Sequence, residues 1–277
     1  MLGNILTGWC DRSLNILPAP QKIVMGEGTF VVKKGLAIVS TDANDFSANF
    51  LQDKLEEVFD FPITLTRQSV NEGFIRFETD KSLPEEGYRL DVTAKGITIV
   101  SATPAGKYYG VQTLLQLFPS EVYSGEHLRL KEDPMEVVTV EDAPRFGYRG
   151  FMLDVSRTFF ELDYLKRYID WMSFHKLNKL HLHLTDDNGW RIEIKKYPEL
   201  TRKGAWRGKN ELIPPTYLSG SERYGGYYTQ KEMKELITYA QQRNVMIIPE
   251  FDLPGHALSS TAVFGNVTCG THTDKPS

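Results

Sequence analysis

The stretch that most constrains the fold of this chain is residues 178–194, NKLHLHLTDDNGWRIEI. Within it, leucines at every second position alternate with His181, His183 and Thr185. Successive side chains of a β-strand point to opposite faces, so the alternation predicts a strand with leucines on one face and imidazoles on the other. Because buried polar groups must find hydrogen-bond partners, inward histidines favour a site over a purely structural core.

The same stretch continues into a segment that carries two carboxylates. Residues 186–189, Asp-Asp-Asn-Gly, have the composition of a turn. Parallel α/β folds place their chemistry at the carboxyl ends of strands. The sequence therefore predicts that Asp186 and Asp187 lie at a functional edge of a sheet.

Composition and charge restrict the class of protein broadly. The length of 277 residues suggests about two domains, with 41% hydrophobic residues for their cores. The net charge of −4 argues against nucleic-acid binding. No apolar run reaches the roughly 18 residues of a membrane span, and residues 1–13 lack the basic and apolar regions of a signal peptide. Cys10 and Cys269 have no CxxC spacing and are expected to be free thiols.

Three regions are expected: a leader over 1–15, a small α/β domain over 16–141 and a second domain over 142–277. The small domain should combine short strands with two helices, over 46–59 and 104–118, where apolar residues recur at helical spacing. Alternating β-branched residues predict its strands, over 37–40, 63–66, 74–78, 88–92 and 97–100. This two-layer unit is interpreted as a packing or positioning domain. Residues 120–147, which are polar and contain prolines, join it to the next domain.

Beyond residue 142 the pattern changes. Apolar strands are expected over 150–155 and 245–251. Leu162, Leu165, Ile169 and Met172 predict an amphipathic helix after the first of them, and Thr229 with Glu232 forms a capping box for a second helix. The order strand, helix, strand, helix, strand predicts a parallel sheet with right-handed crossovers. Because no Gly-x-Gly-x-x-Gly follows the first strand, a (β/α)8 barrel is favoured over a dinucleotide-binding fold.

Each predicted barrel strand is followed by ionisable residues. These are Asp154 and Arg157, then Asp186 and Asp187, then Glu250, Asp252 and His256. The carboxyl ends of barrel strands meet on one face, which predicts a single catalytic or ligand site. Glu250 and Asp252 are two residues apart, so their side chains would lie on the same side of the strand. Such a carboxylate pair could carry out acid/base glycoside chemistry. Pro254 and Gly255 should turn the chain so that His256 returns over the site.

The histidine pair allows a second interpretation. His181 and His183 form an H-x-H at the end of a barrel strand, which binds a divalent metal in amidohydrolase-type enzymes. Those enzymes carry the pair on their first strand, whereas here it stands on the second. A metal-dependent barrel hydrolase is therefore an alternative function.

Three blocks of residues together resemble family 20 β-N-acetylhexosaminidases. They are YRGFMLDVSR at 148–157, HLHLTDDNGWR at 181–191 and PEFDLPGH at 249–256. The N-terminal region agrees with that family's small α/β domain, through LPAPQ at 17–21, EGYRL at 86–90 and AGKYYGVQTLLQL at 105–117. The resemblance implies a small two-layer α/β domain followed by a (β/α)8 TIM-type barrel, of which about the first three strands are present.

The resemblance also implies an activity: retaining removal of terminal, non-reducing β-linked N-acetylglucosamine or N-acetylgalactosamine, with the sugar's own acetamido oxygen as nucleophile. Glycans ending in N-acetylhexosamine are the implied partners, no metal or organic cofactor is implied, and a periplasmic, secreted or lysosomal location is favoured. By position, Arg149 would bind sugar hydroxyls. Asp186 and His256 would form a hydrogen-bonded pair behind the catalytic acid, with Glu250 and Asp252 as supporting carboxylates.

The sequence departs from the family pattern in one respect. The family's acid is the Glu of an Asp-Glu dipeptide after the fourth barrel strand, and no Asp-Glu dipeptide occurs in these 277 residues. The chain is therefore expected to be a fragment without hydrolytic activity of its own, with a non-catalytic sugar-binding or remnant protein as the alternative. Since three strands cannot close an eight-stranded barrel, apolar surface is expected on 150–155 and 245–248.

Overall fold

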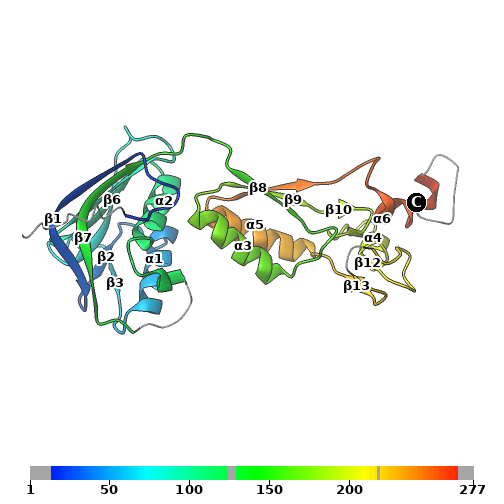
Figure 1. Cartoon of the computed structure of the whole chain (residues 1–277), viewed down its shortest axis with the longest axis horizontal. Helices are drawn as coiled ribbons and strands as arrows, with labels where there is room; N and C mark the ends of the chain where they lie inside the picture. The colour runs from blue at the N-terminus through cyan, green and yellow to red at the C-terminus, as the bar shows by residue number, and fades with distance from the viewer. Residues whose placement is uncertain (1–13, 124–128, 217–218, 268–277) are drawn as a thin grey trace, which may run out of the picture. The chain divides into compact units, whose positions relative to one another are not determined.

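The computed structural model describes residues 14–123, 129–216 and 219–267. Cys10, Cys269 and most of the expected leader lie outside these residues. The chain divides into two compact units, Met1–Arg145 and Phe146–Ser277, and Figure 1 labels the elements of each.

The first unit is built on one mixed sheet of seven strands, in the order β1-β7-β5-β6-β4-β2-β3. Its strands are β1 (Lys22–Lys33), β2 (Ala37–Val39), β3 (Thr64–Thr66), β4 (Phe74–Thr79), β5 (Tyr88–Thr93), β6 (Gly96–Ser101) and β7 (Glu132–Asp142). The pairs from β1 to β6 are antiparallel, and those from β6 to β3 are parallel. The five predicted strands are confirmed as β2 to β6.

Two helices cover one face of this sheet (Figure 1): α1 (Phe46–Val58) and α2 (Pro104–Leu115), followed by a short turn, η1 (Ser120–Tyr123). Asp45 caps α1, because its side chain accepts hydrogen bonds from the Ser47 and Ala48 amides, and Pro104 opens α2 behind its cap Thr103. Both predicted helices are confirmed, and their apolar faces form the core with the sheet.

Strand β1 was not predicted, and β7 is where the prediction was wrong. Much of β7 was interpreted as a connection because of its polar residues and Pro134, yet it pairs with β1 and with β5. Met135, Val138 and Val140 are buried against the core. Pro134 is tolerated because it lies near the start of the strand, beside the edge strand β1.

The second unit contains a parallel sheet in the order β14-β9-β8. Its main elements are β8 (Gly150–Asp154), α3 (Leu162–Phe174), β9 (Lys179–His183), α5 (Gln230–Gln242) and β14 (Met246–Glu250). The two helices lie on the same face of the sheet (Figure 1) and bury the leucine face of β9. The alternation of the opening stretch, the helical pattern of α3 and the Thr229–Glu232 capping box are confirmed.

Between β9 and α5 the chain forms a long excursion of short elements. These are β10 (Thr185–Asp186), β11 (Gly189–Trp190), α4 (Glu199–Arg202), β12 (Trp206–Arg207) and β13 (Tyr224–Gly225). The predicted turn at 186–189 is confirmed as the hairpin β10–β11. Fully buried Arg191 holds the excursion together by donating to backbone carbonyls of Val155, Ser156, Asn188, Ala205 and Gly226. After β14, α6 (Leu258–Thr261) and η2 (Gly265–Val267) end the described chain.

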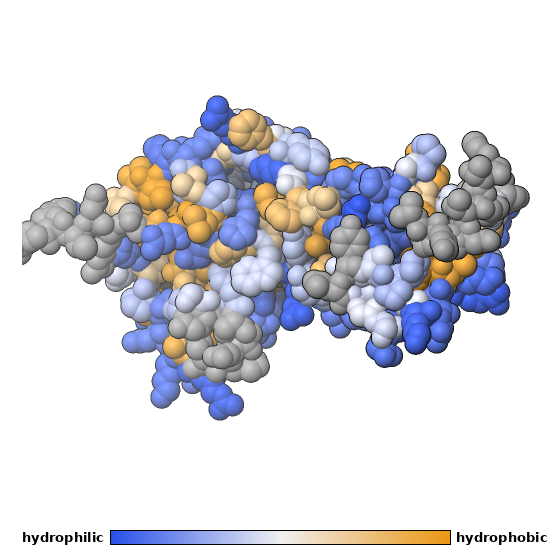
Figure 2. Space-filling view, turned by 45° about the vertical axis from the view of Figure 1, so that its right-hand side comes forward, coloured by the Kyte–Doolittle hydropathy of each residue, from blue (hydrophilic) through white to orange (hydrophobic). Residues whose placement is uncertain are grey.

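Hydrophobic side chains also reach the surface of the second unit. Phe151, Met152 and Met246 are each about half exposed, as expected for strands of an open sheet, although Val155 and Val245 are buried. Figure 2 shows hydrophobic patches among a mostly hydrophilic surface. Among the described residues, no helix has both the length and the apolar character to cross a membrane.

Candidate active site

The carboxyl ends of the three parallel strands bring ionisable side chains into one row. In the register of the sheet, Asp154 of β8 and Glu250 of β14 both stand opposite His183 of β9. Side chains at opposed positions of neighbouring strands share a face. The row therefore lies on the side of the sheet that the helices do not cover.

Asp186 is the most enclosed carboxylate of the site, with only 1% of its surface exposed. Its Oδ2 lies 2.5 Å from Arg157 Nη2 and 2.9 Å from His183 Nε2. Its Oδ1 accepts the Asp187 amide at 2.6 Å and lies 3.4 Å from His256 Nδ1. Asp186 and His256 thus lie close together, and the guanidinium of Arg157 compensates the buried charge.

Asp154 and Arg157 form the tight turn that follows β8. Asp154 Oδ1 accepts the amides of Ser156 and Arg157, and Oδ2 accepts from Arg157 Nη1 at 2.6 Å. Burial by itself would raise the pKa of the Asp154 carboxyl, but the hydrogen bonds from Arg157 hold it below its ordinary value. The guanidinium of Arg157 thus bridges Asp154 and Asp186, with about a third of its side chain exposed.

Glu250 joins two histidines. Its Oε2 lies 2.8 Å from His181 Nε2 and 2.6 Å from His183 Nδ1. Burial would raise the pKa of Glu250, but hydrogen bonds from His183 and His181 lower it. For His183, burial would lower the imidazole pKa, but hydrogen bonds to Glu250 and Asp186 raise it.

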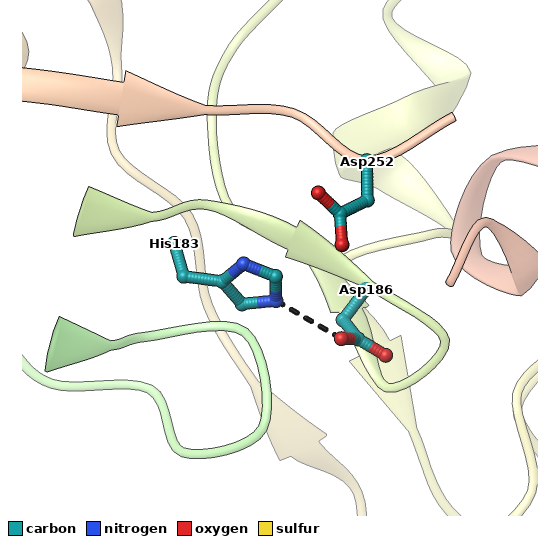
Figure 3. A group of neighbouring side chains, drawn as sticks. All are labelled: His183, Asp186 and Asp252. Atoms are coloured by element: carbon teal, nitrogen blue, oxygen red, sulfur yellow. Dashed lines mark hydrogen bonds and ion pairs between the residues drawn. The ribbon is translucent and has the colours of Figure 1, made fainter. Parts of the chain in front are cut away.

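Asp252 and His256 come from the segment after β14. Since β14 ends at Glu250, strict alternation does not apply to Asp252, but its carboxylate still approaches His183 and Asp186. Figure 3 shows Asp252 and His183 reaching Asp186 from two neighbouring segments. His256 adopts a left-handed backbone with φ of 52° in the predicted turn and is 58% exposed at its side chain. Such a conformation costs energy in a non-glycine residue.

Arg149 lies elsewhere, which corrects the expectation that it faces this site. It precedes β8, at the amino end of the sheet, where its amide donates to the Asn178 side chain. Its guanidinium donates to the carbonyls of Lys176 and Phe146. The length of β8 separates it from Asp186, and Arg157 is the guanidinium at the carboxyl end.

The described residues include two groups with spacing that could hold a metal ion: His183, Asp186 and Asp252, and Asp186, Asp187 and His256. Both depend on Asp186, whose Oδ2 already contacts the guanidinium of Arg157. A second cation there would meet a fixed positive charge. His181 belongs to neither group, and it shares one Glu250 oxygen with His183. The geometry favours a hydrogen-bonded network over the metal-binding alternative.

Two residues of this network were underestimated in the sequence. Arg157 was counted only as an ionisable neighbour of Asp154, although its position three residues later in a turn is the spacing of a local ion pair. His183 was expected on the polar face of its strand and was given a specific role only as half of a metal pair, yet it contacts carboxylates from two different segments. The alternation of β9 placed it on the polar face, but its partners depend on strand register.

The fold and the site define the beginning of an α/β barrel with a charged site at the carboxyl ends of its strands. Comparison with known proteins makes the assignment specific. Residues 13–143 match glycosyl hydrolase family 20, domain 2, and residues 146–277 match the catalytic domain of the same family. The chain belongs to glycosyl hydrolase family 20, with its domain 2 followed by the start of the catalytic TIM-barrel domain.

Relatives of this chain are hexosaminidases. A β-hexosaminidase of Porphyromonas gingivalis is 38% identical over 272 residues, which cover 96% of this chain and 34% of the relative. The N,N'-diacetylchitobiase of Vibrio harveyi is 35% identical, over 89% of this chain and 28% of the relative. The chain thus spans about a third of the length of these curated relatives.

Solved structures of the family share the fold. The exo β-N-acetylglucosaminidase of Vibrio harveyi, in complex with N-acetylglucosamine, superposes with a TM-score of 0.80 at 37% identity, covering 91% of this chain and 38% of that one. The β-N-acetylhexosaminidase of Streptomyces coelicolor A3(2) gives 0.81 at 34% identity, covering 92% and 49%.

Proposed function

We propose that this site belongs to a glycosidase that removes terminal β-linked N-acetylglucosamine or N-acetylgalactosamine with retention of configuration, through attack by the sugar's acetamido oxygen. The observation that carries the proposal is buried Asp186, held by Arg157 and facing His256 at the carboxyl ends of the strands. In glycosidases that retain configuration, a proton donor must serve the leaving oxygen, and nearby charges set its proton affinity.

The described residues take supporting roles in this proposal. Asp186 and His256 form a pair that would sit behind the proton donor and adjust its pKa, and Glu250 and Asp252 supply further negative charge. Arg157 takes the sugar-binding role expected of Arg149, because its planar guanidinium is fixed at the site while part of it stays exposed. No Asp-Glu dipeptide occurs in the sequence, so the proton donor and the carboxylate that holds the acetamido group are assigned to residues outside these 277.

The first test measures the binding of N-acetylglucosamine to residues 1–277 by calorimetry or ligand-observed NMR. Arg157→Lys should weaken binding about tenfold or more, because an ammonium cannot reproduce a two-pronged guanidinium contact. Arg149→Lys is the matched control and should leave sugar affinity unchanged, provided its circular dichroism equals that of the parent. Equal losses in the two variants would contradict the assignment.

The second test is turnover of an aryl N-acetyl-β-glucosaminide. Residues 1–277 should give no hydrolysis above background, because general acid catalysis alone is worth about 10²–10⁴-fold and the positioned acetamido group adds more. Turnover that disappears in Asp186→Ala would show that the chain holds its own proton donor and would overturn this division of roles.

A second candidate function is sugar binding without hydrolysis, favoured by the missing Asp-Glu dipeptide. Both assays can be applied to a hybrid protein in which residues 1–277 are joined to the remaining barrel of a family 20 relative. Their results distinguish the glycosidase from the binding protein. Restored turnover in the hybrid supports the glycosidase. Sugar binding without turnover in a folded hybrid supports the binding protein.

A further inference from the structure

His183 occupies an unusual position between two carboxylates. Its Nε2 lies 2.9 Å from Asp186 Oδ2, and its Nδ1 lies 2.6 Å from Glu250 Oε2. The His183 side chain is only 7% exposed and that of Asp186 only 2%, whereas Glu250 is 35% exposed, so water has least access to the contact with Asp186. Both ring nitrogens are therefore committed to anionic oxygens at hydrogen-bond distance.

This geometry decides the protonation of the ring. An ionised carboxylate only accepts hydrogen bonds, whereas a neutral imidazole donates from one nitrogen and carries a lone pair on the other. In the neutral state one lone pair of the almost buried ring would face a carboxylate oxygen, which is repulsive. Only the imidazolium donates to Asp186 and Glu250 at once.

We propose that His183 is a positioning residue that stays protonated and braces Asp186 against Glu250. Through this brace, Asp186 Oδ2 is held by His183 on one side and by Arg157 on the other. A carboxylate held at one oxygen by two cations cannot rotate easily. Its Oδ1 is thereby directed towards His256 and the Asp187 amide.

The charges around His183 agree with this state. Those close to it are the carboxylates of Asp154, Asp186, Glu250 and Asp252, the guanidinium of Arg157, and the imidazoles of His181 and His256. Carboxylates outnumber the fixed cation, so their field favours a proton on His183. The consequence for sugar chemistry rests on the proposed function, but the protonation of His183 and its hold on Asp186 do not.

The decisive experiment is ring-nitrogen NMR on residues 1–277 labelled with ¹⁵N-histidine. His183→Gln identifies the His183 signals by their loss. At pH 7.5, an ordinary histidine of pKa about 6.5 is roughly one-tenth protonated. His183 should show two protonated nitrogens at this pH in the unmodified protein. A lone-pair nitrogen signal from His183 under these conditions would overturn the proposal without any variant.

Two variants test the brace itself. Glu250→Gln removes one anionic acceptor and should bring the titration of His183 to lower pH, while Asp163→Asn on α3, 93% exposed at its side chain, should leave it unchanged. His183→Gln should shift the ring signals of His256, because Asp186 loses one of its two holds, whereas His175→Gln should not. The positioning role would be refuted if His183 titrated at the same pH in Glu250→Gln as in the unmodified protein. It would also be refuted if the His256 signals stayed unchanged in a folded His183→Gln variant.

These measurements are independent of catalysis. A doubly protonated His183 in a protein that fails to bind N-acetylglucosamine would reject the proposed function and keep the brace. Sugar binding together with a neutral His183 would support the proposed function and reject the brace.

Discussion

The sheet of the first unit and the site of the second unit treat charge in opposite ways. On the sheet of the first unit, Lys22 pairs with Glu141 at 2.9 Å and Arg89 with Asp91 at 2.8 Å, all with side chains a quarter to more than half exposed. In the second unit, Asp186 is buried and meets Arg157, His183 and His256 together. Exposed pairs contribute about 0–1 kcal/mol, whereas breaking a buried pair costs about 3–5 kcal/mol.

The difference indicates where the molecule keeps charge for chemistry. The solvated ion pairs on the sheet of the first unit lie at its surface, and removing one of them should change the free energy of unfolding little. The buried carboxylate of the second unit is expensive to maintain, and replacing such networks by apolar residues is often neutral or stabilising. The cost of burying Asp186 among its partners is therefore best explained by the site they form.

The largest effect is expected for Asp186→Asn. This change leaves Arg157 and His183 with one counter-charge fewer in a buried place, so the free energy of unfolding should fall by about 3–5 kcal/mol. Urea denaturation followed by circular dichroism measures it. A loss below about 1 kcal/mol would mean that the network is no more costly to break than a surface pair.

Arg191→Met should follow in size. Burial, and then the charge of Arg207, lower the pKa of Arg191 to about 10, yet the side chain remains a cation that satisfies several buried carbonyls. Leaving such acceptors unpaired should cost about 3 kcal/mol. Hydrogen exchange should become faster over 188–228 and stay the same in the first unit. Uniform exchange changes in both units would argue against a local role.

A smaller effect is expected from pH. The folded pKa values of Glu250 and Asp154 are lowered, so the stability they contribute is present above their unfolded values and is lost as pH falls through the folded ones. The folded pKa of His183 is raised, so its contribution is complete below about 6.5 and is lost as pH rises through the folded value. The denaturation midpoint should therefore fall both at low pH and at high pH. Glu250→Gln should make both of these decreases smaller.

The smallest effect is expected for Lys22→Met in the first unit. The ion pair with Glu141 is exposed and screened by salt, so the free energy of unfolding should change by less than about 1 kcal/mol. The same urea titration used for Asp186→Asn measures it. A cost comparable to that of Asp186→Asn would remove the contrast between the units.

Local pattern was sufficient to predict much of the fold. The alternation of β9, the helical spacing of α1 to α3, the capping box of α5 and the turn at 186–189 all depend on neighbours within a few residues. Backbone preferences and hydrophobic periodicity act over that range. Strand β7 was missed because its partner β1 lies about a hundred residues away and its polar residues conceal the inward Met135, Val138 and Val140.

The candidate site was predictable in its residues but not in its connections. The sequence by itself determined that ionisable residues, among them a carboxylate each time, follow each barrel strand, because composition and turn chemistry are local. Which arginine reaches Asp186 was decided by the tertiary structure, since Arg149 and Arg157 stand at opposite ends of β8. The contact of His183 with Glu250 requires the register of β9 and β14, in which the two residues stand opposite each other. Register follows from packing between distant segments, and no local pattern contains it.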